Sequence, residues 1–85
     1  MNMYRVFVVR SAQKQVEKFP KKDQKRIVQA IISLSSDPWK GKKLEGEQKG
    51  KWSIRVWPYR IIYTIEKEIV TVTVLRIGYR KDVYR

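Results

Sequence analysis

The 85-residue chain contains no histidine and no cysteine. Without cysteine it can form neither a disulfide framework nor a thiolate metal site. Without histidine it also lacks the commonest general base and the commonest metal ligand of proteins. Any catalysis by this chain must therefore depend on Lys, Arg, Tyr, Ser, Thr or its few carboxylates.

Long apolar runs are missing as well. No segment approaches the roughly 20 apolar residues that span a bilayer. The N-terminus, MNMYRVFVVRSAQK, has only a short apolar stretch and does not resemble a signal peptide. We therefore predict a cytoplasmic protein that does not associate with a membrane.

Acidic residues are few. Eight Asp and Glu stand against 20 Lys and Arg, which gives a net charge of +12. Such a charge attracts polyanions: nucleic acid, an acidic membrane or an acidic protein. A highly soluble surface is the plainer interpretation, but a mixed-charge surface of that kind would carry more Glu. The composition thus favours a polyanionic partner.

The length and the 42% hydrophobic content predict one domain over residues 1–85. A first strand is expected over residues 4–9, where β-branched and aromatic residues are concentrated. Ser11 is a plausible N-cap for a helix that ends before Pro20. A second helix should begin at Lys21 or Lys22 and stop by Asp37-Pro38.

Residues 40–51 form a glycine-punctuated, mostly charged connector. Three strands are predicted after it, over residues 52–57, 60–66 and 69–77, with the last one central and broken by Gly78. Helices grouped ahead of a meander predict an α+β fold with the order β-α-α-β-β-β. Two N-terminal helices would pack on one face of a small, mostly antiparallel four-stranded sheet.

The last third of the chain holds the candidate chemistry. In a meander, its cations can converge on one concave patch, where arginine forks grip phosphate oxygens and stabilise a pentacoordinate transition state. Nearby aromatic side chains offer surfaces on which unpaired bases stack, as a single-stranded RNA site requires. The cations are Arg55, Arg60, Arg76 and Arg80, and the aromatics are Trp57, Tyr59, Tyr79 and Tyr84. Trp52 and Tyr63 are expected in the core instead.

Several segments resemble the RelE/ParE toxin superfamily. They are KLEG at 43–46, the run WSIRVWPYRIIYTI and the ending VLRIGYRKDVYR, together with the order of elements. The YRIIY segment is common to both branches of the superfamily, so it supports the fold more than the activity. The Gly-x-Arg-x-x-x-Tyr ending is more specific and resembles the RelE mRNA-interferase branch rather than the ParE gyrase-poison branch.

The resemblance implies the toxin of a type II toxin–antitoxin system, an endoribonuclease that enters the 30S A site of the ribosome and cleaves mRNA by attack of the 2′-hydroxyl. It implies that neither a metal nor another cofactor takes part. Arg60 would hold the scissile phosphate, and Arg80 would neutralise transition-state charge or assist the leaving group. Tyr84 would stack on a base or orient the 2′-hydroxyl.

The chain departs from the family pattern on the strand before the turn, where two lysines are common and Ser53 and Arg55 stand here. Arg55 can clamp a phosphate but is a poor general base, and serine is no better without an activating partner. The strand period of two puts Lys51 on the same side, so Lys51 is a candidate base. Alternatively, catalysis relies on positioning and charge stabilisation. The expected RNA-binding residues are Lys43, Lys49, Lys51, Ser53, Tyr79 and Lys81.

The resemblance also implies a cognate antitoxin. Because the chain is so basic, we expect an acidic, partly disordered antitoxin segment that covers the phosphate-binding arginines. Two other functions stay open: a ParE-type toxin that poisons DNA gyrase, and a non-catalytic RNA-binding protein.

Overall fold

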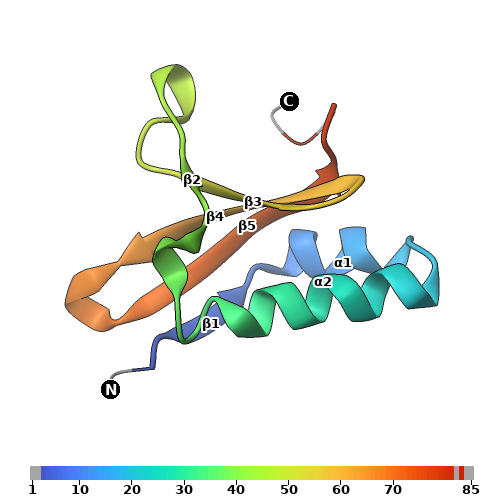
Figure 1. Cartoon of the computed structure of the whole chain (residues 1–85), viewed down its shortest axis with the longest axis horizontal. Helices are drawn as coiled ribbons and strands as arrows, with labels where there is room; N and C mark the ends of the chain where they lie inside the picture. Colours follow the sequence, from blue (N-terminus) through green and yellow to red (C-terminus); the bar gives the residue numbers. More distant parts are fainter. Residues whose placement is uncertain (1–2, 82, 84–85) are drawn as a thin grey trace.

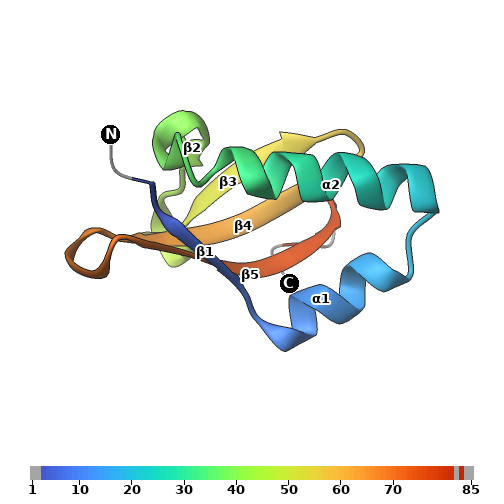
Figure 2. The same cartoon turned by 90° about the horizontal axis from the view of Figure 1, so that it is seen from below.

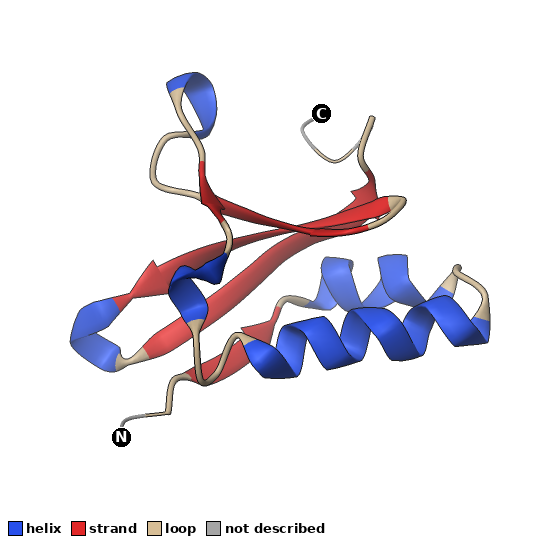
Figure 3. Cartoon of the chain, viewed as in Figure 1, coloured by secondary structure: helices blue, strands red, loops and turns tan. Residues whose placement is uncertain are grey.

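The computed structural model describes residues 3–81 and Val83 (Figure 1). A strand and two helices come first, and the remaining strands and three short 3-10 helices follow (Figure 3). In chain order the elements are β1 (Arg5–Val8), α1 (Arg10–Glu17), α2 (Lys21–Ser33), η1 (Pro38–Lys40), β2 (Lys42–Lys43), η2 (Gly46–Gln48), β3 (Trp52–Val56), β4 (Tyr59–Glu66), η3 (Lys67–Ile69) and β5 (Thr71–Tyr79).

The strands form one sheet in the order β1-β5-β4-β3-β2. β1 runs parallel to β5, and the other neighbours are antiparallel. Both helices lie on one face of the sheet (Figures 1 and 2). The predicted α+β fold is confirmed, with one correction: the sheet has five strands. The extra strand, β2, forms inside the charged connector because Lys42 and Lys43 pair with β3. The middle of the sheet is consequently β4.

The first helix begins directly after β1, so the prediction of Ser11 as its N-cap is wrong. Val9 is the last residue of extended backbone, and its amide still donates to the carbonyl of Val74 at 3.0 Å. Its own carbonyl already accepts from the amides of Ala12 and Gln13. Helix geometry therefore starts at Arg10, one residue before Ser11. The start of the second helix at Lys21 is as predicted.

The end of β5 also differs from the prediction. Gly78 does not break the strand, because it pairs with Arg60, and the ladder continues to the Tyr59–Tyr79 pair. A register shift at Ile62 and Tyr63 leaves Leu75 as an extra residue opposite them. Such a bulge lets the chain switch faces, so Arg76 points to the side opposite the core residues of β5.

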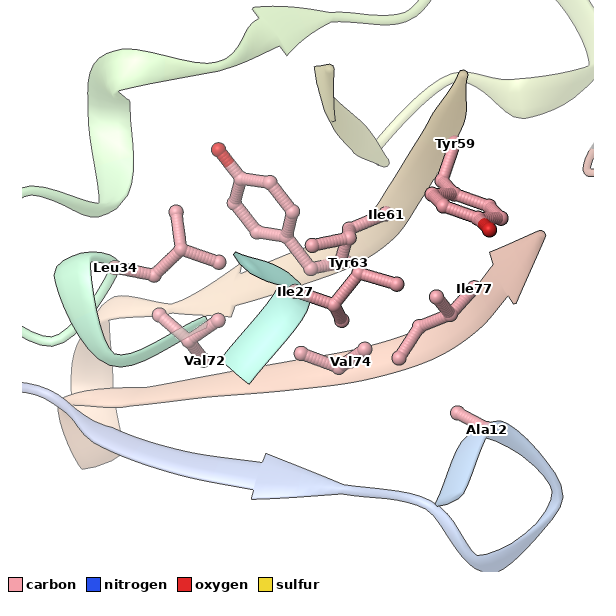
Figure 4. Close-up of a cluster of buried hydrophobic side chains, with 9 residues drawn as sticks. All are labelled: Ala12, Ile27, Leu34, Tyr59, Ile61, Tyr63, Val72, Val74 and Ile77. Carbon is pink, nitrogen blue, oxygen red and sulfur yellow. The ribbon is translucent and has the colours of Figure 1, made fainter. Parts of the chain in front are cut away.

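The hydrophobic core fills the space between the helices and the sheet (Figure 4). Tyr63 lies within it, as predicted, and donates its hydroxyl hydrogen to the carbonyl of Pro38 at 2.9 Å. Trp52 packs against its margin. The core residues are Ala12, Ile27, Leu34, Tyr59, Ile61, Tyr63, Val72, Val74 and Ile77.

Candidate phosphodiester-binding site

The sheet face opposite the helices, here called the open face, carries the polar side chains of β3 and β4. On β3 the residues Trp52, Ile54 and Val56 pack against the core. Alternation along a strand therefore directs Ser53 and Arg55 to the open face. Arg60 on β4 is the direct cross-strand partner of Arg55, so the two share this face.

Ser53 and Arg60 form the floor of the site. Ser53 is only 2% exposed, and its hydroxyl oxygen accepts a hydrogen bond of 3.3 Å from the guanidinium of Arg60. Lys42 on β2 pairs directly with Ser53. A pocket of about 300 Å³, here called the basic pocket, opens at this point. It is lined by Lys40, Gly41, Lys42, Ser53, Ile54, Arg55 and Arg60.

The basic pocket has a strongly positive lining. Four of its seven lining residues are Lys or Arg, and none is Asp or Glu. Lys40 directs its ammonium to the hydroxyl of Ser33 at 2.9 Å. Within residues 3–81 and Val83, the one ion pair joins Asp23 to Arg26 on α2. Lys42, Arg55 and Arg60 therefore present uncompensated charge to any anion that enters.

Arg80 lies beside the turn that joins β3 to β4. Its amide donates to the carbonyl of Pro58 at 3.1 Å, and its guanidinium lies 4.9 Å from the ring centre of Trp57. The guanidinium of Arg55 lies 5.9 Å from the same ring centre. Arg55 thus borders the basic pocket on one side and shares Trp57 with Arg80 on the other.

Beyond Arg80, the structure describes Lys81 and Val83. Val83 is 4% exposed, and its carbonyl accepts a hydrogen bond of 3.2 Å from Arg76. This contact holds the backbone of Val83 beside Arg76. Tyr84, predicted as a catalytic residue, lies outside the described residues.

The remaining predicted RNA-binding residues divide by location. Lys51 precedes β3, and its ammonium donates to the side-chain oxygen of Gln48 at 3.1 Å. Lys49 is exposed in the same loop. Lys43 pairs with Trp52 and so lies on the helix side of β2, away from the basic pocket.

Tyr79 also lies on the helix side, where its ring packs 5.1 Å from that of Tyr59 and 5.9 Å from that of Phe19. Lys81 is exposed and lines a second pocket of about 310 Å³ with Tyr79, Arg80 and Pro58. Tyr59 itself is 2% exposed, so its prediction as a base-stacking surface is wrong. Its place in the β4 alternation turns it toward the core.

Sequence reasoning missed two basic residues of the pocket, Lys40 and Lys42, of which Lys42 pairs with Ser53. The position of Lys42 depends on β2, a two-residue strand inside a glycine-rich and charged segment. The adjacent lysines were the only signal, and without the pairing of β2 nothing showed which of them faces Ser53. In the structure, Lys42 lines the pocket and Lys43 faces the opposite side of the sheet.

Two further features of the described residues concern metal binding and membrane insertion. Across the described ranges, no three His, Cys, Asp or Glu side chains gather closely enough to hold a metal ion. In the same part of the chain, no helix is long and apolar enough to cross a membrane.

Residues 6–84 match the family described as "ParE toxin of type II toxin-antitoxin system, parDE". The chain is also 36% identical over 84 residues to Toxin RelG of Mycobacterium tuberculosis, an alignment that covers 96% of this chain and 97% of that toxin. The chain therefore belongs to the ParE toxin family, within the RelE/ParE superfamily. It is a toxin of a type II toxin–antitoxin system.

Solved structures agree with this assignment. The toxin–antitoxin complex RelBE2 from Mycobacterium tuberculosis contains a chain with a TM-score of 0.87 and 33% identity, covering 96% of this chain and 97% of that one. The archaeal RelE–RelB complex from Pyrococcus horikoshii OT3 contains one with a TM-score of 0.80 and 25% identity, covering 95% and 99%. RelE-type toxins are thus among the relatives of this chain.

Proposed function

We propose that this toxin is a metal-independent endoribonuclease that cleaves mRNA in the 30S A site of the ribosome and thereby inhibits translation. One observation carries the proposal: the basic pocket on the open face, with Arg55 and Arg60 directly paired across the ladder and no carboxylate in its lining. Such a pocket accepts a phosphodiester group. The relation of this chain to Toxin RelG and to RelE-type toxins supports a target in translation.

The reaction needs no covalent intermediate with the protein. The ribose 2′-oxygen attacks the adjacent phosphorus, and the bond from phosphorus to the 5′-oxygen breaks. The products are a 2′,3′-cyclic phosphate and a 5′-hydroxyl. One proton leaves the 2′-hydroxyl, and one reaches the departing oxygen. Arg55 and Arg60 hold the non-bridging oxygens, on which negative charge grows in the transition state. Removing one preorganised donor of this kind typically costs about 10²–10³ in rate.

The contacts of Ser53 and Lys51 favour neither side chain as the group that accepts the proton of the 2′-hydroxyl. The hydroxyl oxygen of Ser53 accepts a hydrogen bond from a cation, which makes it a poor acceptor for a further proton. The ammonium of Lys51 is bonded to Gln48. We therefore assign most of the rate to positioning and charge stabilisation, because an aligned attack alone removes a large part of the barrier. Arg80 and Tyr84 would act at the leaving group and the attacking ribose.

A cognate acidic antitoxin is the proposed protein partner. The net charge of +12 favours an acidic segment that lies over the open face. The two complexes named above each pair a related toxin with an antitoxin. Because the proposed targets are the ribosome and mRNA, the toxin acts in the cytoplasm.

Cleavage of mRNA on purified ribosomes tests this function. Primer extension should show codon-positioned cuts with the wild type, in the presence of a chelator, and weaker cuts with Arg60→Ala, Arg80→Ala and Tyr84→Phe. The matching family is named for ParE, so DNA supercoiling by gyrase should be measured with the same preparations. Inhibition of supercoiling without RNA scission would replace the proposal with gyrase poisoning.

A further inference from the structure

Trp57 is a large aromatic residue left 54% exposed at the turn between β3 and β4. An exposed indole loses the free energy that burial would provide, so its retention at a turn calls for another role. Two guanidinium groups lie near its ring, Arg80 at 4.9 Å and Arg55 at 5.9 Å from the centre. Arg55 lies on β3 and Arg80 directly follows β5, so the ring of Trp57 lies near cations from two separate segments of the chain.

The backbone of Trp57 is held in place from the helix layer. Arg26 on α2 donates a hydrogen bond of 2.7 Å to the carbonyl of Trp57. Arg26 also pairs with Asp23 at 3.5 Å, and Asp23 accepts the hydroxyl hydrogen of Tyr59 at 2.6 Å. The turn is thus tied to α2 on both sides of Pro58, which holds the backbone that carries the indole.

The two arginines near Trp57 are both positively charged and lie close to the same ring. Like charges repel one another, and in the part of the chain that the structure describes neither Arg55 nor Arg80 forms an ion pair with a carboxylate. The face of an indole ring carries negative quadrupole density, which attracts guanidinium. The ring therefore offsets the repulsion and limits the rotamers that both long side chains can adopt.

We propose that Trp57 is a positioning residue that holds Arg55 and Arg80 beside the basic pocket, so that both reach the same phosphate of bound RNA. The inference rests on the proposed function and adds a residue to its site. It concerns cation–π attraction and not apolar bulk. Loss of the ring should lower the rate of cleavage about five- to thirtyfold, since one such contact at an exposed site is weak and two add up. The amount of ribosome needed for half-saturation should change less.

Fluorinated tryptophans separate cation–π attraction from shape, because each fluorine weakens the ring quadrupole while the side chain keeps nearly the same size. Installed at position 57 alone, a mono-, di- and trifluoro series should lower the cleavage rate stepwise. The matched control is Trp39, whose ring lies 5.8 Å from the ammonium of Lys67 and outside the basic pocket. The same series there should leave the rate unchanged. A rate that does not depend on fluorination of Trp57 would overturn the proposal.

A binding measurement keeps the test independent of cleavage. The side-chain Nε–H signals of Arg55 and Arg80 are followed by NMR while inorganic phosphate is added to the free toxin. In the wild type both signals should shift together along one titration curve. In Trp57→Leu they should need more phosphate and respond separately, and Trp57→Phe should restore part of the wild-type response. Identical curves in wild type and Trp57→Leu would disprove the positioning role, even if the toxin cuts RNA. A normal phosphate response without RNA cleavage would instead count against the proposed function.

Discussion

Arg60 on β4 donates a hydrogen bond of 3.3 Å to the buried hydroxyl oxygen of Ser53 on β3. Ser53 therefore contributes to the site by accepting a hydrogen bond from an arginine. Because Ser53 is buried, its hydroxyl is available to Arg60 and poorly available to water. The contact fixes the direction of the guanidinium at the floor of the basic pocket.

The first prediction concerns Ser53→Ala. Loss of one hydrogen bond is worth about 0.5–1.5 kcal/mol, so cleavage on ribosomes should slow about two- to tenfold. Single-turnover rates at saturating ribosome concentration provide the measurement. A loss of a thousandfold or so, of the size expected for a group that reacts directly, would show that Ser53 itself takes part in proton transfer.

The second prediction concerns Gly41, at the edge of the basic pocket. A Cβ at this position would contact the hydroxyl of Tyr63 and lie 2.7 Å from the backbone oxygen of Ser53. Both neighbours are held, one by its bond to Pro38 and the other by the sheet. Gly41→Ala should therefore lower the free energy of unfolding by about 1–3 kcal/mol.

Gly78→Ala is the matched control for that variant, because no heavy atom lies within 4 Å of its added Cβ. Its free energy of unfolding should stay near the wild-type value or rise slightly. Urea unfolding of the three proteins measures the difference. Equal stability of the two alanine variants would contradict the close approach at Gly41.

The third prediction concerns the bond between Tyr59 and Asp23, which ties β4 to α2. Tyr59→Phe removes a hydrogen bond to a charged acceptor and should cost about 1.5–3 kcal/mol of unfolding free energy. Asp23→Asn keeps an acceptor oxygen and should cost less. The double variant, measured by urea unfolding, should be less than additive; strict additivity would mean that the two groups do not interact.

The fourth prediction concerns alkaline pH. Burial raises the pKa of Tyr63 from 10.0 to about 12. The bond to Asp23, together with burial, also raises the pKa of Tyr59. Between pH 10.0 and about 12 the folded chain therefore keeps protons that the unfolded chain releases. Stability is complete below this window and falls as the pH rises through it.

Tyr63→Phe separates this effect from the titration of the lysines, which both proteins share. Unfolding free energies at about pH 9 and about pH 11 should differ more in the wild type than in the variant, because only the wild type has the Tyr63 proton to lose. Equal differences would show that Tyr63 does not contribute.

Much of the fold could be predicted from residue patterns alone. The β-branched residues of positions 4–9 predicted the first strand, and apolar residues at helical spacing on either side of Pro20 predicted the two helices. The alternation from Trp52 to Val56 predicted the strand that displays Ser53 and Arg55. These features depend on neighbours in the chain. The short strand β2 could not be predicted in this way, because Lys42 and Lys43 have no strand pattern and are ordered by pairing with β3.

The candidate site shows the same limit. Arg55 and Arg60 were expected together, and their direct pairing places them so. Tyr59 and Tyr79 were expected as base platforms. The parity of β4 and the bulge in β5 turn both toward the helices, where their rings pack together, but only Tyr59 is buried, and Tyr79 stays 49% exposed. A bulge shifts face assignment by one residue, which no local pattern reveals.

The most direct test of the account is the cleavage rate of ribosome-bound mRNA by Arg60→Ala, compared with Arg10→Ala. Each variant loses one positive charge, but Arg60 lines the basic pocket and Arg10 lies exposed at the start of α1. The account predicts a loss of about 10²–10³ for Arg60→Ala and a rate near that of the wild type for Arg10→Ala. Equal rates for the two variants would contradict a phosphodiester site at the basic pocket.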